Sequence, residues 1–492
     1  METQTSENPT FDTQDEFNRK PIAENIIRLL TSPIDLSPMV IDGGWGTGKT
    51  EFCQKLIRLM QQQHLDYQPV YIDAFRSDHS GEPLLALLAE IIKTCKPPKG
   101  SDEKLIEEHK DRIRRITKTA GFLMKTVAKA AVGHVLKQNT DDLAEELQQI
   151  MNDGQEADSL AETVTDAATT IASHTIDATV EALLKEQIEA EKNLETLKAC
   201  LKELAADKPI ILVIDELDRC RPDYAVDMLE VIKHVFDVEN VKVVLVTNTK
   251  QLRAAINHRY GVEVDAQKYL DKFLKYSFAL PDKIVARFEE DWALVAVKHF
   301  KQLIRKSHIC NELQGLIYES PEDISFINFI GDMIARHDIS LRETERFVRF
   351  LEIYHSLSRG LNINKSVPQV ILLRITGVFI FCFHSDLIAS INKNRTDAKD
   401  FARLFNVQSW PDTPIESYGF NCADIIAVML IKHSKIEDAR FQEWEDKEYW
   451  QTYIDHHFFK NKYIVSQKRG IYGVLSILKE TFQVLSLEQT PQ

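Results

Sequence analysis

Ile41 to Thr50 reads IDGGWGTGKT, and its four glycines mark a turn between two regular elements. The apolar run PMVI, which ends at Ile41, is typical of a short buried strand. The apolar residues that follow recur at the spacing of one face of a helix: Phe52, Leu56, Leu59 and Met60. The stretch therefore predicts a strand that turns sharply into an amphipathic helix.

The spacing of Gly43, Gly48, Lys49 and Thr50 fits G-x-x-x-x-G-K-[ST], the phosphate-binding P-loop. In such a loop the backbone N–H groups point at phosphate oxygens, and glycine tolerates the positive φ that this requires. The helix that follows adds its own N–H groups and positive dipole end. We expect Lys49 to contact the β- and γ-phosphates and the Thr50 hydroxyl to bind Mg²⁺. The expected nucleotide-binding residues are Gly43, Gly44, Trp45, Gly46, Thr47, Gly48, Lys49, Thr50 and Glu51.

A second apolar strand ends in acidic residues, in the segment PIILVIDELDRCRPD. Residues 210–214 form the apolar run, and Asp215 and Glu216 follow it, which is the Walker B pattern. We expect Asp215 to hold Mg²⁺, usually through water, and Glu216 to orient or deprotonate the attacking water. An ordinary strand followed by a solvated acidic turn is the alternative.

A third apolar strand, VKVVLVTN, ends in the polar residues Thr247 and Asn248. Some P-loop ATPases place an extra strand between the P-loop strand and the Walker B strand. A polar residue at the end of that strand then senses the γ-phosphate. Asn248 is the candidate here.

The 492 residues carry 60 basic and 75 acidic side chains, a net charge of −15. This charge disfavours a protein that coats nucleic acid, although a local basic patch could still bind it. Seven cysteines without C-x-x-C spacing indicate neither a zinc site nor a disulfide framework, and they suit a reducing cytoplasm. The apolar run at Ile375–Phe383 is too short for a bilayer, which needs about twenty residues. We therefore expect a cytoplasmic protein with no membrane span.

Strands alternate with helices on both sides of a polar, helical stretch. This pattern predicts an α/β fold with a parallel sheet covered by helices on both faces. The predicted division is 1–96 as the first half of a nucleotide-binding domain, 97–200 as a helical insertion, 201–285 as the second half, and 286–492 as a helical lid or effector domain.

The insertion has a marked charge split. Lys110 to Lys137 holds eight basic residues against one acid, whereas Gln138 to Leu184 holds eleven acids and no Lys or Arg. Two such helices could pair with each other, or one could face a partner. Solvated faces of a helical hairpin are the alternative. We expect the insertion to dock a protein partner or a second subunit.

The chain resembles the KAP-type P-loop NTPases, close to the AAA+ and STAND groups. The stretches that carry the resemblance are DEFNRKPIAENIIRLL, GGWGTGKT, VYIDAFRSDHSGEPLLALLAEII, LVIDELDRCRPDYAVDMLEVIKHVF, VVLVTNTKQL, KYLDKF and SLRETERFVRF. They cover most of residues 12–351 apart from 97–200. Many members of the family carry transmembrane helices between the P-loop and Walker B. The insertion here is polar, so the membrane-anchored role does not carry over.

The resemblance implies further site residues. Arg19 lies in the segment that passes beside the base in related ATPases, and Arg342 resembles a sensor arginine from the helical lid. Asp218 and Arg219 match an Asp-Arg pair that supports the site or contacts another subunit. A surface ion pair is the alternative for each of these residues.

We therefore expect a Mg²⁺-dependent ATPase that acts as a conformational switch, with contacts to Asn248 and Arg342 released when the γ-phosphate leaves. The resemblance implies a role in a bacterial antiphage complex, with protein partners or self-association. The alternatives are a scaffold that binds nucleotide with negligible turnover, and a DNA-stimulated motor. No Asn-Lys-x-Asp guanine motif is present, which favours ATP over GTP.

Overall fold

The structure is a computed structural model that describes residues 9–95, 103–130, 176–206, 208–285, 292–307, 311–317, 325–363, 365–411, 421–454 and 473–487. The chain divides into two compact units. The first holds Met1–Gly44 and Gly48–Leu280, and the second holds Trp45–Thr47 and Pro281–Gln492. Each unit is described separately below. The predicted four-part domain division stays a prediction.

The first unit is built on a five-stranded sheet in the order β2-β3-β4-β1-β5. Every neighbouring pair in it runs parallel. The strands are β1 (Met39–Asp42), β2 (Gln68–Asp73), β3 (Ile210–Asp215), β4 (Val241–Thr247) and β5 (Tyr276–Ala279). The parallel α/β sheet predicted from the sequence is confirmed, and β4 lies between the P-loop strand β1 and the Walker B strand β3.

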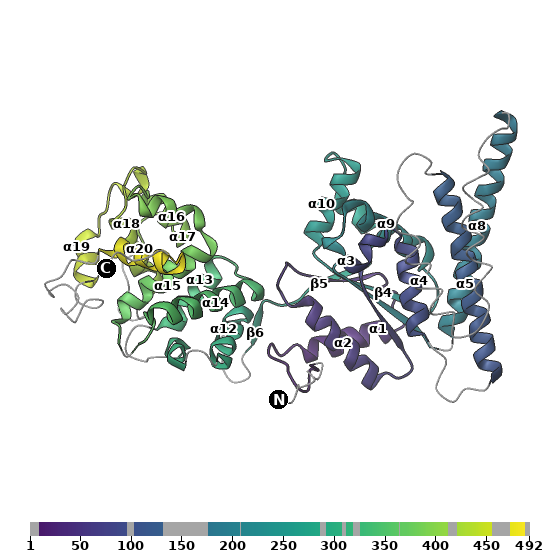
Figure 1. The fold of residues 1–492 in the computed structure, drawn as a ribbon, viewed down its shortest axis with the longest axis horizontal. Helices are drawn as coiled ribbons and strands as arrows, with labels where there is room; N and C mark the ends of the chain where they lie inside the picture. The colour runs from purple at the N-terminus through teal and green to yellow at the C-terminus, as the bar shows by residue number, and fades with distance from the viewer. Residues whose placement is uncertain are drawn as a thin grey trace. The chain divides into compact units, whose positions relative to one another are not determined.

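Alternate residues of the strands enter two separate apolar cores, one on each face of the sheet. Val40, Leu212 and Leu245 lie in one core, while Ile41 and Val213 lie in the other. Strand side chains point to opposite faces in turn, so both faces need helices to cover them. Helices α1 (Lys20–Thr31) and α2 (Lys49–Gln63) cover one face, and α4 (Pro83–Thr94), α9 (Pro222–Val235), α10 (Thr249–Tyr260) and α11 (Ala266–Asp271) contribute to the other (Figure 1).

Two long helices, α5 (Glu103–Ala130) and α8 (Ile176–Ala206), lie side by side within the predicted insertion (Figure 1). Several side chains of these two helices pack into the nucleotide domain. Ile116, Leu197 and Leu201 are fully buried and belong to the same core as the strands. Burying one such side chain stabilises a fold by about 1.5–3 kcal/mol, so this part of the helix pair is a structural element of the first unit. Residues 131–175, which contain much of the predicted charge split, lie outside the described residues.

The second unit is mainly helical in its described residues. Its long helices are α12 (Val295–Lys306), α13 (Phe326–Arg336), α14 (Leu341–Ser358), α15 (Pro368–Phe383), α18 (Cys422–Lys432) and α20 (Val474–Leu485). Shorter helices are α16 (Ser385–Asn392), α17 (Ala398–Leu404) and α19 (Lys447–Tyr453), and a small antiparallel pair, β6 (Lys283–Val285) with β7 (Trp292–Leu294), was not predicted.

The apolar run at 375–383 lies in α15 and is packed inside this unit. α15 approaches α20 at Gly377, where a Cβ atom would stand 2.9 Å from Thr481 Cβ. Glycine at this point allows the close helix contact. No helix in the described ranges combines the length and the apolar content that a bilayer crossing requires.

Candidate functional site

The P-loop connects β1 to α2, as the glycine spacing predicts. Gly48 is the N-cap of α2 and has φ +78°, and Gly46 has φ +77°. Both values lie in the left-handed region, where a residue with a Cβ is strained. The predicted core face of α2 is confirmed, because Phe52, Leu56 and the two residues that complete the face are buried. The loop therefore has the backbone that the motif requires.

Lys49 turns back into the loop. Its side chain is nearly buried, with 8% of the residue exposed. The Nζ donates hydrogen bonds to the carbonyls of Gly43 and Gly44, the second at 2.9 Å. Burial lowers the pKa of Lys49, while the nearby charges of Asp218 and Asp215 oppose that shift. The ammonium group is thus held at the loop by carbonyl oxygens that phosphate oxygens could replace.

Asp215 ends β3 with only 1% of the residue exposed. The hydroxyl of Tyr71, from the neighbouring strand β2, donates to its Oδ2 at 3.1 Å. A side-chain hydrogen bond also joins Asp215 to Thr50 of the P-loop. Burial raises the pKa of Asp215, and these hydrogen bonds and Lys49 act against it. The fold thus brings together the two residues predicted to bind the metal.

Glu216 follows with φ +59°, a left-handed conformation that is uncommon outside glycine. Strain of this kind concentrates at functional sites. Its carboxylate pairs with Arg219 at 3.0 Å, and the exposed fractions of the two side chains are 17% and 31%. Burial raises the pKa of Glu216, and the charge of Arg219 opposes the shift. The predicted general base is therefore fixed by an arginine one turn away.

Asp218 and Arg219 do not form an isolated pair. Arg219 binds Glu216, and Asp218 accepts a hydrogen bond from the Thr247 hydroxyl at 3.1 Å. Asp218 also contributes to the charge around Lys49. This geometry favours a role in supporting the site.

Asn248 is the N-cap of α10, where its Oδ1 accepts from the backbone N–H groups of Lys250 and Gln251. If Asn248 contacts a γ-phosphate, the hydrogen bond must therefore come from its Nδ2 group. Thr247, the preceding residue, is fully buried at the end of β4. The sensor role of Asn248 stays a prediction.

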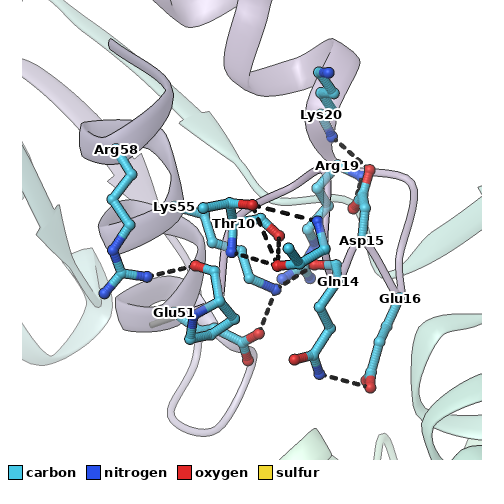
Figure 2. A network of polar contacts seen from close by, with 11 residues as sticks. Thr10, Gln14, Asp15, Glu16, Arg19, Lys20, Glu51, Lys55 and Arg58 are labelled. Atoms are coloured by element: carbon cyan, nitrogen blue, oxygen red, sulfur yellow. Dashed lines mark hydrogen bonds and ion pairs between the residues drawn. The ribbon is translucent and has the colours of Figure 1, made fainter. Parts of the chain in front are cut away.

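The N-terminal segment is tied to α2, the helix that begins at the P-loop (Figure 2). Lys55 Nζ donates to the Gln14 carbonyl and to Glu51 Oε1, both at 2.6 Å. Asp15 accepts the N–H groups at the start of α1, including that of Arg19 at 2.8 Å. The segment therefore holds a fixed position against the nucleotide domain.

Arg19 is 6% exposed. Its guanidinium carbon lies over the Phe17 ring, 5.1 Å from the ring centre. Burial lowers the pKa of Arg19 to about 10, opposed by the charges of Glu51 and Asp15. Two residues predicted to bind nucleotide, Arg19 and Glu51, thus lie near each other. Arg342 lies on α14 in the second unit, in a helix that starts with a capping box at Ser340. Its predicted sensor role stays a prediction.

Sequence reasoning missed two residues of the site region. Tyr71 is a polar residue within a buried strand, and its phenol fixes Asp215. Asp42 ends β1 and accepts from the N–H and the hydroxyl of Thr249, at 2.9 and 3.0 Å. For Asp42 the available signal was its place at the carboxyl end of a parallel strand, because such ends meet at one edge of the sheet.

The parallel sheet, the glycine loop with Lys49, and the Thr50–Asp215 contact define a P-loop nucleotide-binding protein. A family model described as the KAP family P-loop domain matches residues 19–358, more than half of the chain. The chain belongs to the KAP family. Membership implies nucleotide binding, usually with Mg²⁺.

Similarities to one curated protein and to solved structures were also found. The chain is 24% identical over 278 residues to the Phage T7 exclusion protein of Escherichia coli (strain K12), which covers 54% of this chain. The match spans 33% of that relative's own length. A solved structure of the Aeropyrum pernix ORC2 protein, in ADPNP–ADP complexes, is 11% identical with a TM-score of 0.31, covering 96% of this chain and 94% of that one. A TM-score this low does not establish a shared fold.

Proposed function

We propose that this KAP protein is a Mg²⁺-dependent ATPase whose hydrolysis cycle drives a conformational switch. The observation that carries the proposal is the meeting of Lys49, Thr50 and Asp215 at one edge of the sheet. These residues come from a P-loop and from the end of a buried strand, and Glu216 stands directly beside them. A cation, a hydroxyl and two carboxylates in this arrangement suit phosphoryl transfer to water.

The side chains of Thr50 and Asp215 offer the oxygen ligands that a magnesium ion needs. The Thr50 hydroxyl and the Asp215 carboxylate are oxygen donors already in contact with each other. Mg²⁺ prefers oxygen ligands, and in such sites it takes one or two carboxylates together with substrate phosphates. When bound, it neutralises charge that develops on the transferred phosphoryl group.

The chain's own residues would divide the remaining work. The backbone N–H groups of the loop and the Lys49 ammonium bind phosphate oxygens. Tyr71 holds Asp215 in place through its 3.1 Å hydrogen bond. Glu216 orients the attacking water or accepts its proton, with Arg219 fixing the carboxylate.

A scaffold that binds nucleotide with negligible turnover is the other candidate. Phosphate release from Mg-ATP, measured beside equilibrium ATP binding, separates the two. The ATPase proposal expects binding together with release that exceeds the level of Glu216→Gln. Binding with release no higher than in that variant would favour the scaffold. Adding duplex DNA to the same assay tests the DNA-stimulated motor.

Arg219→Ala should slow hydrolysis and change its pH dependence. The arginine opposes the burial that raises the pKa of Glu216, so its removal raises that pKa further. The acidic limb of the rate profile should therefore move to higher pH, because Glu216 stays protonated over a wider range. Arg219→Lys should restore part of the effect. An unshifted acidic limb would mean that Arg219 does not act on Glu216.

An antiphage role is proposed from the similarity to a phage exclusion protein. Cells that produce the wild-type chain should reduce the plating efficiency of phage T7, and cells that produce Glu216→Gln should not. Equal protection by both chains would separate the phage phenotype from hydrolysis.

A further inference from the structure

The second unit contains a hollow of about 360 Å³ that lies outside the nucleotide site. Its walls come from α17 and from the short 3₁₀ helix Ala439–Phe441, with the turn after α17 between them. The side chains that line it include three cations, Lys399, Arg403 and Arg440, together with the amides of Asn406 and Gln408. Among the residues that the structure describes, no carboxylate lines this hollow.

The walls are held together by contacts behind the hollow. The Ala398 N–H donates to the Lys435 carbonyl at 2.7 Å, which joins the start of α17 to the loop before the 3₁₀ helix. Trp410 donates from Nε1 to the Phe441 carbonyl at 3.1 Å. Its ring stacks on that of Trp444, with the ring centres 4.0 Å apart. The backbone segments that carry the three cations are therefore held by packed elements.

Two carboxylates at the start of α17 are engaged elsewhere. Asp397 and Asp400 form the capping box of α17, and Asp397 is buried. Asp397 also accepts the Glu437 N–H at 3.3 Å. These acids stabilise the wall and do not line the hollow.

Arg440 is oriented by Asp438. Its Nε lies 3.0 Å from Oδ1, and its Nη2 lies 2.7 Å from Oδ2 of the same carboxylate. The hydrogen bond from Arg440 lowers the pKa of Asp438 to about 2, with a smaller contribution from the charge of Lys399. Asp438 therefore stays ionised at neutral pH, and it fixes the guanidinium with Nη1 facing Gln408.

We propose that this hollow, which we call the basic hollow, binds the phosphodiester backbone of a nucleic acid. Lys399, Arg403 and Arg440 are exposed, so each would hold a single free phosphate only weakly in water. A polyanion gains from Lys399 and Arg403 at once because condensed counterions are released. Arg440, whose charge Asp438 balances, can still donate a hydrogen bond to a phosphate oxygen. Amide side chains such as Asn406 and Gln408 also bind phosphate oxygens in nucleic-acid complexes. A local basic site is compatible with the chain's net charge of −15, because the contact is short-ranged.

The test titrates the protein, without ATP, into a short labelled DNA duplex and into an RNA duplex of the same sequence, and follows binding by fluorescence anisotropy. Lys399→Gln/Arg403→Gln/Arg440→Gln should bind the preferred duplex about tenfold or more weakly at low salt. Its slope of log K against log salt, taken from about 50 to 200 mM, should be shallower by about 0.9 for each phosphate that the variant no longer neutralises. Base sequence should have little effect, because backbone contacts carry no sequence information.

The matched control is Arg305→Gln/Arg349→Gln/Lys365→Gln, which removes the same charge from exposed positions of the same unit. It should bind like the wild type. Equally weakened binding in both triple variants, unchanged binding in the hollow variant, or no duplex binding by the wild type would each overturn the proposal. Weaker binding of the hollow variant to anionic vesicles, without any duplex binding, would also overturn it and point to a membrane surface. The assay contains no ATP, so its result is independent of the proposed hydrolysis.

Discussion

Lys49→Ala is expected to weaken ATP binding by roughly 10- to 100-fold and to remove measurable hydrolysis. The Lys49 ammonium is the cation that the P-loop presents to the phosphates, and a hydrogen bond to a charged group contributes about 1.5–3 kcal/mol. Each 1.4 kcal/mol is about tenfold in affinity. Calorimetric titration with Mg-ATP checks the binding, and phosphate release checks the turnover.

Lys242→Ala is the control for this variant. Lys242 is also partly buried, and its Nζ donates to the carbonyls of Leu30 and Ser32 at 2.6 and 2.9 Å. It lies at the opposite end of the sheet from the P-loop, near the start of β4. Its replacement should lower the melting temperature but leave ATP affinity unchanged. If Lys49→Ala bound ATP as tightly as the wild type, the P-loop assignment would be wrong.

Glu216→Gln is expected to keep Mg-ATP bound while hydrolysis falls by about 10²-fold or more, the usual scale for losing a general base. Glutamine keeps the size of the side chain, so the chain should still fold and bind. It cannot accept a proton from water. Single-turnover hydrolysis, measured with the protein in excess so that all the ATP is bound, separates this defect from weak binding.

The matched control is Glu239→Gln, which makes the same substitution at an exposed acid paired with Lys202 at 2.7 Å. This variant should hydrolyse ATP like the wild type. If Glu216→Gln also kept its rate, another acid would orient the water, and Asp218 is the next suspect because it lies in the charge field of Lys49.

The sequence alone was sufficient for the parts of the site that are local in the chain. The glycine spacing predicted a loop with positive-φ glycines, which Gly46 and Gly48 supply, and the apolar runs predicted β3 and β4 within one residue. Backbone sterics and side-chain periodicity act over a few residues, so they can be read directly from the order of the amino acids. The parallel sheet followed from strands that alternate with helices.

Tertiary structure decided which of these parts meet. Tyr71 reaches Asp215 across 144 positions of sequence, and Thr50 contacts the same carboxylate. Side chains of α5 and α8 also enter the core of the first unit, from positions far from the strands in sequence. Such contacts depend on the burial of many side chains at once, which no short stretch of sequence specifies. The sequence by itself therefore determined that this protein has a P-loop and a Walker B strand, whereas packing decided how their side chains come together.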